Sequence, residues 1–331
     1  MLYPISIRLT GILTRTLPVL AALSLLAGAA QAADPYPNRP VRIIVPFAAA
    51  GSGDAVTRIV AQRLTARLGQ TFIVENRAGA GGAIGEAATA ASTPDGYTIG
   101  FVSSGHAWIG ALNPNLPFNP SRDLTPIALI CSTPYVVLAR NNAPFRTVQE
   151  FIAYAKANPG KASIGSAGVG TLTHLLPAWL MAETGSQWIH VPFNGTAPAM
   201  NALLGGTVDI IFDPIATSLP QIQANKAKLL ATTGAMRARV LPNTPTLADL
   251  GYLARGATWF GLMAPTGVPR PIIERINQEV NAILEEPEVK QRLEALNFTI
   301  EAGSIQHFGE FIEAQTKAWA KIVKDNNIKG D

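Results

Sequence analysis

The stretch from Ile43 to Asp54, IIVPFAAAGSGD, is the part of the chain best suited to ligand chemistry. An uncharged apolar run ends in a loop of small residues, and a helical pattern follows directly. Residues Ala48 to Gly53 have little bulk, so a ligand can approach the backbone closely. A helix that starts at the carboxyl end of a buried strand points free N–H groups and its positive dipole end at that ligand. The stretch therefore predicts a seat for an anion, although any strand-to-helix turn of an α/β fold has a similar pattern.

The same pattern returns in the second half of the chain. A short strand over Ala162–Ser166 is followed by the small-residue loop Ala167–Thr171 and by a helix from Thr173. Neither loop contains Lys or Arg, so backbone N–H groups, hydroxyls and helix dipoles would have to hold an anion. Charge-assisted hydrogen bonds contribute about 1.5–3 kcal/mol each. Roughly three or four of them would give micromolar affinity, about −8 kcal/mol, after the costs of association.

Motifs for redox and hydrolytic chemistry are incomplete. A dinucleotide fingerprint G-x-G-x-x-G fails over 79–84, where Ile84 occupies the sixth position. A nucleophile elbow G-x-S-x-G fails at Ser166, which Ile164 precedes at the first glycine position, and fails at Ser104 as well. An exported serine hydrolase that uses Ser166 or Ser104 remains the alternative hypothesis.

Metal chemistry is also not indicated. No two of the four histidines have the spacing of metal ligands, and Cys131 is the only cysteine. Cys131 lies in an apolar strand pattern, which predicts a small core residue. We therefore expect no catalytic residue, no metal and no cofactor.

The N-terminus has the pattern of an export signal. Arg8 and Arg15 precede an apolar run over Leu17–Ala30, and Ala30-Gln31-Ala32 is a small-x-small cleavage site. We predict that residues 1–32 are removed near Ala32 and that the mature chain is periplasmic and monomeric. Loss of two arginines takes the formal charge from +4 to +2. The remaining basic residues are scattered, so nucleic acid is not an expected partner.

Strands and helices alternate along the mature chain, which predicts an α/β fold with doubly wound parallel sheets. A long apolar strand over Pro126–Arg140 is expected to pass from one domain to the next, and a strand over Thr258–Ala264 to return. The segment from Asn113 to Pro126 is expected to be a loop. We place domain 1 at residues 33–130 plus 250–331 and domain 2 at residues 131–249.

An ordered set of short motifs resembles the periplasmic receptors of tripartite tricarboxylate transporters, also called Bug proteins. The resemblance covers essentially the whole mature chain. Its markers are Tyr36-Pro37-x-x-Pro40, Val45-Pro46-Phe47 with Asp54, Val74-Glu75-Asn76-Arg77 with Gly79-Ala80-Gly81-Gly82, Pro94-Asp95-Gly96-Tyr97-Thr98, Ser166-x-Gly168-x-Gly170 with His174-Leu175, His190-Val191-Pro192, Pro242-x-x-Pro245-Thr246, and Trp259-x-Gly261 with Ala264-Pro265.

This resemblance implies two α/β domains of the periplasmic-binding-protein type that close on a small carboxylate. The ligand would then pass to membrane subunits of a tripartite tricarboxylate transporter. A ligand-sensing partner of a membrane signalling protein would bind in the same way. The implied ligand-binding residues are Phe47, Ala48, Ala50, Gly51, Ser52, Gly53, Asp54, Ser103, Ser104, Ser166, Ala167, Gly168, Gly170, Thr171, His174, Phe193, Asn194, Gly195, Thr196 and Asp213.

Two departures from the family pattern bear on specificity. The first loop has Ala48-Ala49-Ala50-Gly51 where the family commonly has Pro-Ala-Gly-Gly. After His-Val-Pro, Phe193-Asn194-Gly195 replaces a pattern in which a basic residue follows Tyr. Without that basic residue, a less charged or aromatic acid such as terephthalate suits the site better than a tricarboxylate. Asp54 would repel a carboxylate, so we expect it to stabilise its own helix.

Overall fold

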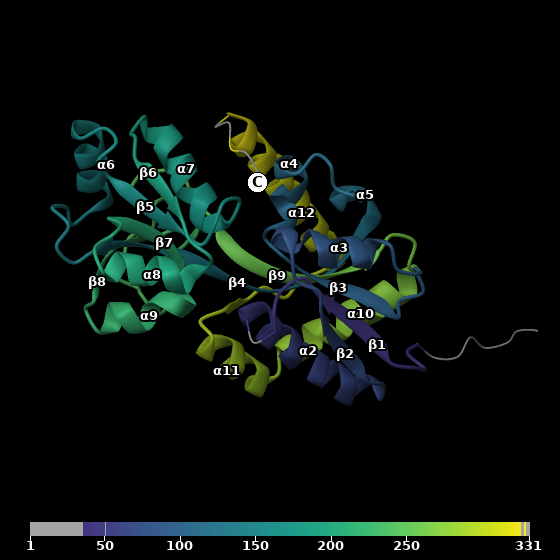
Figure 1. Cartoon of the computed structure of the whole chain (residues 1–331). Helices are drawn as coiled ribbons and strands as arrows, with labels where there is room; N and C mark the ends of the chain where they lie inside the picture. Colours follow the sequence, from purple (N-terminus) through teal and green to yellow (C-terminus); the bar gives the residue numbers. More distant parts are fainter. Residues whose placement is uncertain (1–35, 50, 326–327, 329–331) are drawn as a thin grey trace, which may run out of the picture. The chain divides into compact units, whose positions relative to one another are not determined.

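The computed structural model describes residues 36–49, 51–325 and 328. The predicted signal segment and Ala50 lie outside these residues. The chain divides into a unit of residues 1–38 and a unit of residues 39–331, and the fold below is that of the second unit. Strands and helices alternate along it as predicted, so the α/β class is confirmed (Figure 1).

The first group of strands surrounds β1 (Val41–Val45), which pairs in parallel with β2 (Phe72–Asn76) and β3 (Thr98–Ser103). Four of the five residues of β1 are buried, as expected for a strand covered on both faces. The helices of this group are α2 (Ser52–Leu68), η1 (Ala80–Gly82), α3 (Ala83–Ala90), α4 (His106–Leu112) and α5 (Pro120–Asp123).

The second group repeats the arrangement. Strand β5 (Ser163–Ser166) pairs in parallel with β6 (Ile189–Pro192) and β7 (Ile210–Pro214). The other elements of this group are α6 (Val148–Ala157), α7 (Leu172–Thr184), α8 (Thr196–Leu204), α9 (Ile215–Gln223) and β8 (Ala227–Thr232).

Two antiparallel strands join the groups. The first part of β4 (Leu124–Arg140) pairs with β9 (Ala257–Pro265), and its last part pairs with β7 and β8. Strand β9 also pairs with β3. The strand order is therefore β2-β1-β3-β9-β4-β7-β5-β6, with β8 and the short β10 (Thr299–Ile300) paired to β4. The predicted parallel pairing is found among β1, β2 and β3 and among β5, β6 and β7, whereas β4, β8, β9 and β10 form antiparallel pairs.

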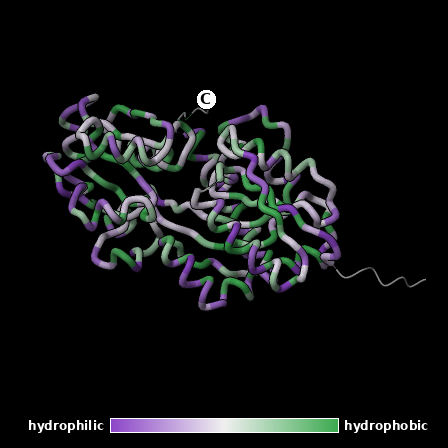
Figure 2. Tube along the Cα trace, turned by 60° about the horizontal axis from the view of Figure 1, so that its bottom comes forward, coloured by the Kyte–Doolittle hydropathy of each residue, from purple (hydrophilic) through white to green (hydrophobic). Residues whose placement is uncertain are grey.

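The core lies under this junction. Cys131 is fully buried in β4, as predicted. The C-terminal helices are α10 (Arg270–Leu284), α11 (Pro287–Ala295) and α12 (Ile305–Asp325). Phe308 of α12 packs edge-on against Trp259 of β9, with ring centroids 5.7 Å apart. Figure 2 shows the hydrophobic residues concentrated along the inner strands, with hydrophilic residues on the outer segments.

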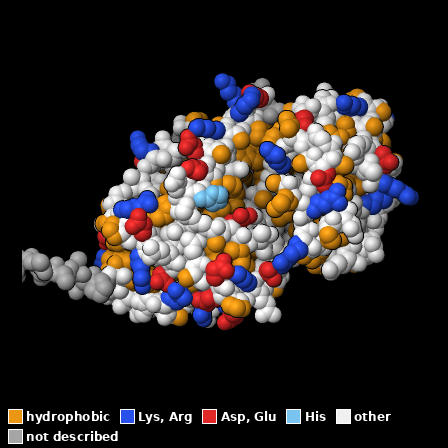
Figure 3. All heavy atoms as spheres, turned by 180° about the vertical axis from the view of Figure 1, so that it is seen from behind, with side chains coloured by type: hydrophobic (Ala, Val, Ile, Leu, Met, Phe, Trp, Pro, Cys, Tyr) orange, Lys and Arg blue, Asp and Glu red, His pale blue; other side chains and the backbone are white. Residues whose placement is uncertain are grey.

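The surface is charged but mixed in sign. On the face shown in Figure 3, Lys and Arg side chains are interspersed with Asp and Glu. Ion pairs connect helices, as in Arg67 with Glu279 (2.5 Å) and Arg63 with Glu286 (2.5 Å). Within the described ranges, no helix has the length and apolar character needed to cross a bilayer.

Helix α2 starts at Ser52 after an extended Gly51, with Asp54 in its first turn. One sequence-based expectation about local structure was wrong. The segment expected to be a loop contains α5, because Asn119 accepts hydrogen bonds from the Ser121 and Arg122 N–H groups and so caps a short helix.

The packing of β9 predicts that Gly261→Ala lowers the free energy of unfolding by about 1–3 kcal/mol, because overpacking forces side chains from their rotamers. A Cβ at Gly261 would lie 2.9 Å from the Ala128 carbonyl oxygen and closer still to the Phe308 ring. Urea denaturation measures the change. Gly110→Ala is the control, because its Cβ would meet nothing nearer than Pro120 at 3.8 Å. Equal effects of the two substitutions would contradict the packing argument.

Candidate functional site

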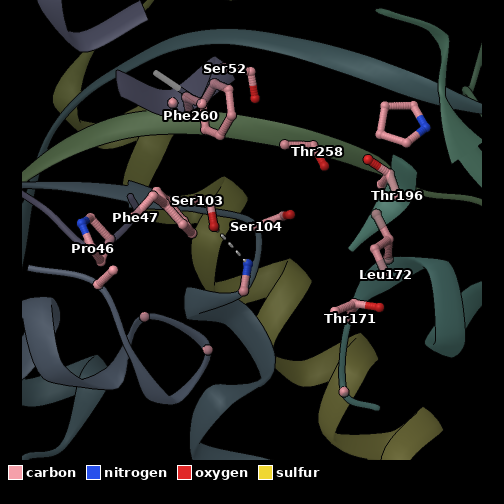
Figure 4. A pocket seen from close by; sticks show the side chains of 18 of the residues that line it. Pro46, Phe47, Ser52, Ser103, Ser104, Thr171, Leu172, Thr196, Thr258 and Phe260 are labelled. Atoms are coloured by element: carbon pink, nitrogen blue, oxygen red, sulfur yellow. Dashed lines mark hydrogen bonds between the residues drawn. The ribbon is translucent and has the colours of Figure 1, made fainter. Parts of the chain in front are cut away.

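A cavity of about 870 Å³ lies where strands end and helices begin (Figure 4). The first and second strand groups both contribute to its wall, and β4 and β9 cross beside it. The lining residues come from the first loop (46–49 and 51–53), the glycine-rich loop (78–82), the end of β3 and α4 (103–105, 108, 109, 112 and 113), the second loop (169–172), the starts of α8 and α9 (196, 214, 216 and 217), strands β4 and β9 (133, 135, 258 and 260), and residue 298.

A buried polar network fixes the first loop. The Asn76 side-chain amide donates to the Phe47 carbonyl oxygen (3.0 Å) and to Asp54 Oδ1 (3.0 Å). Arg58 donates to Asp54 Oδ2 at 2.9 Å. Asp54 is only 3% exposed and is absent from the cavity lining. Its carboxylate therefore holds the loop against β2 and does not face a ligand.

The glycine-rich loop forms a second wall that the sequence analysis did not assign to the site. Residues 79–82 all have positive φ, which glycine adopts readily and which bends the chain tightly. Gly85 then lies so close to Pro46 that an added Cβ would be 2.7 Å from the Pro46 Cα. Glu86 of α3 and His106 of α4 are both buried and 2.8 Å apart, which ties the two helices together behind this wall.

The second loop is held from both sides. The Trp108 indole N–H donates to the Gly170 carbonyl oxygen (3.0 Å), which connects α4 to the loop. The Gly170 N–H donates to His174 Nδ1 (3.2 Å), and the Thr171 hydroxyl donates to the Gly168 carbonyl oxygen (2.7 Å). Gly170 and Thr171 consequently line the cavity at the start of α7.

Ser166 and His190 are in hydrogen-bond contact, with 2.6 Å between Oγ and Nε2. Their geometry alone resembles a nucleophile with its base. Ser166 has no exposed surface, however, and its Oγ also accepts the Gly168 N–H. His190 stacks on His174 with centroids 4.1 Å apart, and burial lowers the pKa of His190. The pair supports the second loop and does not present a nucleophile to the cavity.

The structure brings ten of the predicted site residues onto the cavity wall and leaves the other described ones behind it. On the wall are Phe47, Ala48, Gly51, Ser52, Gly53, Ser103, Ser104, Gly170, Thr171 and Thr196. Absent from the lining are Asp54, Ser166, Ala167, Gly168, His174, Phe193, Asn194, Gly195 and Asp213. Lining residues that the sequence analysis missed include Gly79, Gly81, Trp108, Leu112, Tyr135, Leu172, Thr258, Phe260 and Phe298. Local pattern gave a signal only for the glycine run.

The described lining residues include no Lys, Arg, Asp, Glu or His. Their side-chain polarity comes mostly from hydroxyl groups, several of which face one another across the cavity in Figure 4. Helices α2, α7 and α8 all start at the cavity wall. The first N–H groups of a helix have no intrahelical partner, and its dipole is positive at that end. The cavity is therefore suited to a negatively charged group and to an apolar body packed against Phe47, Phe260 and Phe298.

Asp213 lies just behind this wall at the end of β7 and is 1% exposed. Its Oδ2 accepts hydrogen bonds from the Thr217 and Ser218 hydroxyls, both at 2.6 Å. Burial raises the pKa of Asp213 to about 6, although the two hydroxyls act to lower it. The group is thus ionised at neutral pH at a cost in stability.

We predict that Asp213→Asn stabilises the protein at neutral pH and leaves it unchanged near pH 4. Between the ordinary value of 3.8 and about 6, folded Asp213 keeps a proton that the unfolded chain releases. Its contribution to the free energy of unfolding therefore falls as pH rises through this window, by roughly 2–3 kcal/mol. Urea denaturation of the wild-type and variant proteins from pH 4 to 8 measures the difference between their free energies of unfolding. The titration of His190 cancels in this difference because both proteins contain His190. A difference that is constant with pH would refute the assignment.

Comparison with known proteins places this geometry in context. The family model described as tripartite tricarboxylate transporter family receptor matches residues 56–328. The chain is 34% identical over 323 residues to protein BugT of Bordetella pertussis. The aligned region covers 96% of this chain and 99% of BugT.

Solved structures of similar proteins agree in fold. A Rhodopseudomonas palustris protein solved with adipate is 30% identical with a TM-score of 0.79, over 89% of this chain and all of that one. MatC from Rhodopseudomonas palustris, solved with bound malate, is 31% identical with a TM-score of 0.75, over 87% of this chain and all of MatC. The predicted periplasmic-binding-protein type of fold is confirmed by the structure of periplasmic binding protein BugD, which is 33% identical with a TM-score of 0.76, over 89% of this chain and all of BugD.

Proposed function

This chain belongs to the tripartite tricarboxylate transporter receptor family, and from that premise we propose that it is a periplasmic solute-binding protein, which captures a small organic carboxylate for delivery to a membrane transporter of that type. One observation carries the proposal: helices α2, α7 and α8 start at one cavity whose described lining has no charged side chain. Free N–H groups at these helix starts are suited to a carboxylate.

Capture would use closure of two domains around the cavity. We assign residues 33–130 plus 250–331 to one domain and residues 131–249 to the other. The chain passes from the first domain to the second within β4 and returns before β9, and these two strands pair with each other. The first loop and the second loop, on opposite sides of that boundary, would then approach the same ligand.

The cavity wall favours an acid with few charges and an apolar body. A tricarboxylate would bring three negative groups into a cavity where, in the described lining, no cation is available to pair with them. Phe47, Trp108 and Phe260 offer aromatic surface for a ring or a chain of methylene groups. Two related proteins were solved with the dicarboxylates adipate and malate, which supports dicarboxylic acids as ligands, and the aromatic wall supports aromatic acids, so these two groups are the proposed class.

A thermal-shift panel tests the proposal with succinate, malate, citrate, adipate, terephthalate and benzoate. A ligand at about 100 times its Kd adds about 2.7 kcal/mol to the free energy of unfolding, which raises Tm by several degrees. We expect stabilisation by adipate or by the aromatic acids and little or none by citrate. The absence of any shift would contradict carboxylate capture, and tight binding of citrate alone would contradict the proposed class.

Ser52→Pro tests whether a main-chain amide holds the acid. Ser52 is the first residue of α2, where proline fits, and the preceding Gly51 is extended, as proline requires. The substitution removes one N–H from the seat, so we expect the Kd of the best acid to rise about ten-fold or more.

Ser52→Ala is the matched control, because it removes the hydroxyl and keeps the amide. Isothermal titration calorimetry of both variants separates the two groups. If Ser52→Pro binds as tightly as Ser52→Ala, the amide seat at α2 is wrong.

A further inference from the structure

We propose that a pair of hydroxyls on the cavity wall, those of Thr258 of β9 and Tyr135 of β4, selects acids that carry a hydroxyl or oxo group on their carbon skeleton. This inference rests on the proposed function, since it concerns the part of the same ligand that the helix starts do not hold. The hydroxyl pair would form an uncharged recognition site beside the helix starts that bind the carboxylate.

The two side chains come from the paired strands of the junction. Thr258 Oγ1 and Tyr135 Oη are 2.8 Å apart, and either can be the donor. Tyr135 is 6% exposed, whereas Thr258 is half-buried and lines the cavity. In the view of Figure 4 the Thr258 hydroxyl lies between those of Ser104 and Thr196. Thr258 is thus the member of the pair that a ligand can reach.

A count of protons shows that the pair has capacity left for a ligand. Two hydroxyls carry two protons, and their mutual bond uses one of them. Burial raises the pKa of Tyr135 to about 12, so the phenol keeps its proton at physiological pH. When Tyr135 donates to Thr258, the Thr258 O–H is available to donate into the cavity. When the bond is reversed, lone pairs of Thr258 remain available to accept from a ligand hydroxyl.

The surroundings of the pair favour a neutral partner over a second carboxylate. Tyr135 is paired in register with Pro214, next to Asp213, and the charge of Asp213 contributes to the raised pKa of Tyr135. The described cavity lining has no cation to offset that charge. Phe260, two residues along β9 and also on the cavity wall, is apolar. A hydroxyl or carbonyl oxygen on the ligand therefore suits this position.

Such a site discriminates against ligands that lack the matching group. An unsubstituted acid would cover the Thr258 hydroxyl and displace its water without replacing the hydrogen bond. Sites built to hydrogen-bond one substrate group reject analogues without that group more strongly than apolar pockets reject an added methylene. We expect a preference of about ten-fold within a matched pair, the equivalent of one ordinary hydrogen bond.

The test compares matched acids by isothermal titration calorimetry: malate with succinate, 3-hydroxyadipate with adipate, and 4-hydroxybenzoate with benzoate. In wild-type protein we expect the oxygenated acid to bind about ten-fold more tightly in at least one pair. Thr258→Val should abolish that preference by weakening the oxygenated acid alone. Thr258→Ser, which retains the hydroxyl, should preserve the preference.

Thr232→Val is the matched control. Thr232 is fully buried in β8, its hydroxyl has no partner within the described residues, and it is not one of the cavity-lining residues. The same change of side chain there should leave every Kd within two-fold of the wild-type value.

The possible outcomes separate the two proposals. If wild-type protein binds no acid in the panel, carboxylate capture itself fails and the selectivity proposal falls with it. If acids bind but no pair shows a preference for the oxygenated member, only the selectivity proposal is overturned. The same holds if Thr258→Val weakens both members of a pair equally, or if Thr258→Ser loses the preference while remaining folded by circular dichroism.

Discussion

The antiparallel pairing of β4 with β9 is the interaction on which the rest of the structure depends. It joins the parallel group around β1 to the parallel group around β5, and one hydrophobic cluster contains residues of both, such as Val102 of β3 and Ile164 of β5. Because the strands of both groups end beside this junction, the helices that follow them start at one cavity. The same two strands place Thr258 and Tyr135 on the cavity wall. One strand pair thus provides both the connection between the groups and the surface against which a ligand would lie.

Three buried carboxylates stand close to the cavity without lining it. Asp54 is bonded to Arg58 and Asn76, Glu86 to His106, and Asp213 to two hydroxyls. Each is engaged by a neighbour, so the helix starts remain the groups that face the ligand. The first two acids have cationic or titratable partners, whereas Asp213 has neutral partners only, and burial raises its pKa although both hydroxyls act to lower it. The described cavity lining therefore contains helix starts but no carboxylate.

Sequence pattern was sufficient for the strands and for the two loops, because a buried parallel strand followed by small residues has a strong local signature. It was insufficient where the site depends on contacts between distant segments. Thr258 and Tyr135 meet only through the register of β4 with β9, and Trp108 reaches Gly170 across 62 positions of sequence. Ser166 shows the converse: it was expected to contact a ligand, but it bonds to His190 and to the Gly168 amide and has no exposed surface.

The indole of Trp108 links the cavity wall to the C-terminal helix α12, and the contact between the two includes a pair of fluorescent side chains. Its N–H is bonded to the second loop, and its ring lies 5.0 Å from Trp319, which is in turn 5.8 Å from Trp179. Three ultraviolet chromophores are therefore coupled in a chain that begins at the cavity. Any displacement of the second loop changes the polarity around the first of them, so the protein contains its own fluorescent reporter of occupancy and needs no attached dye.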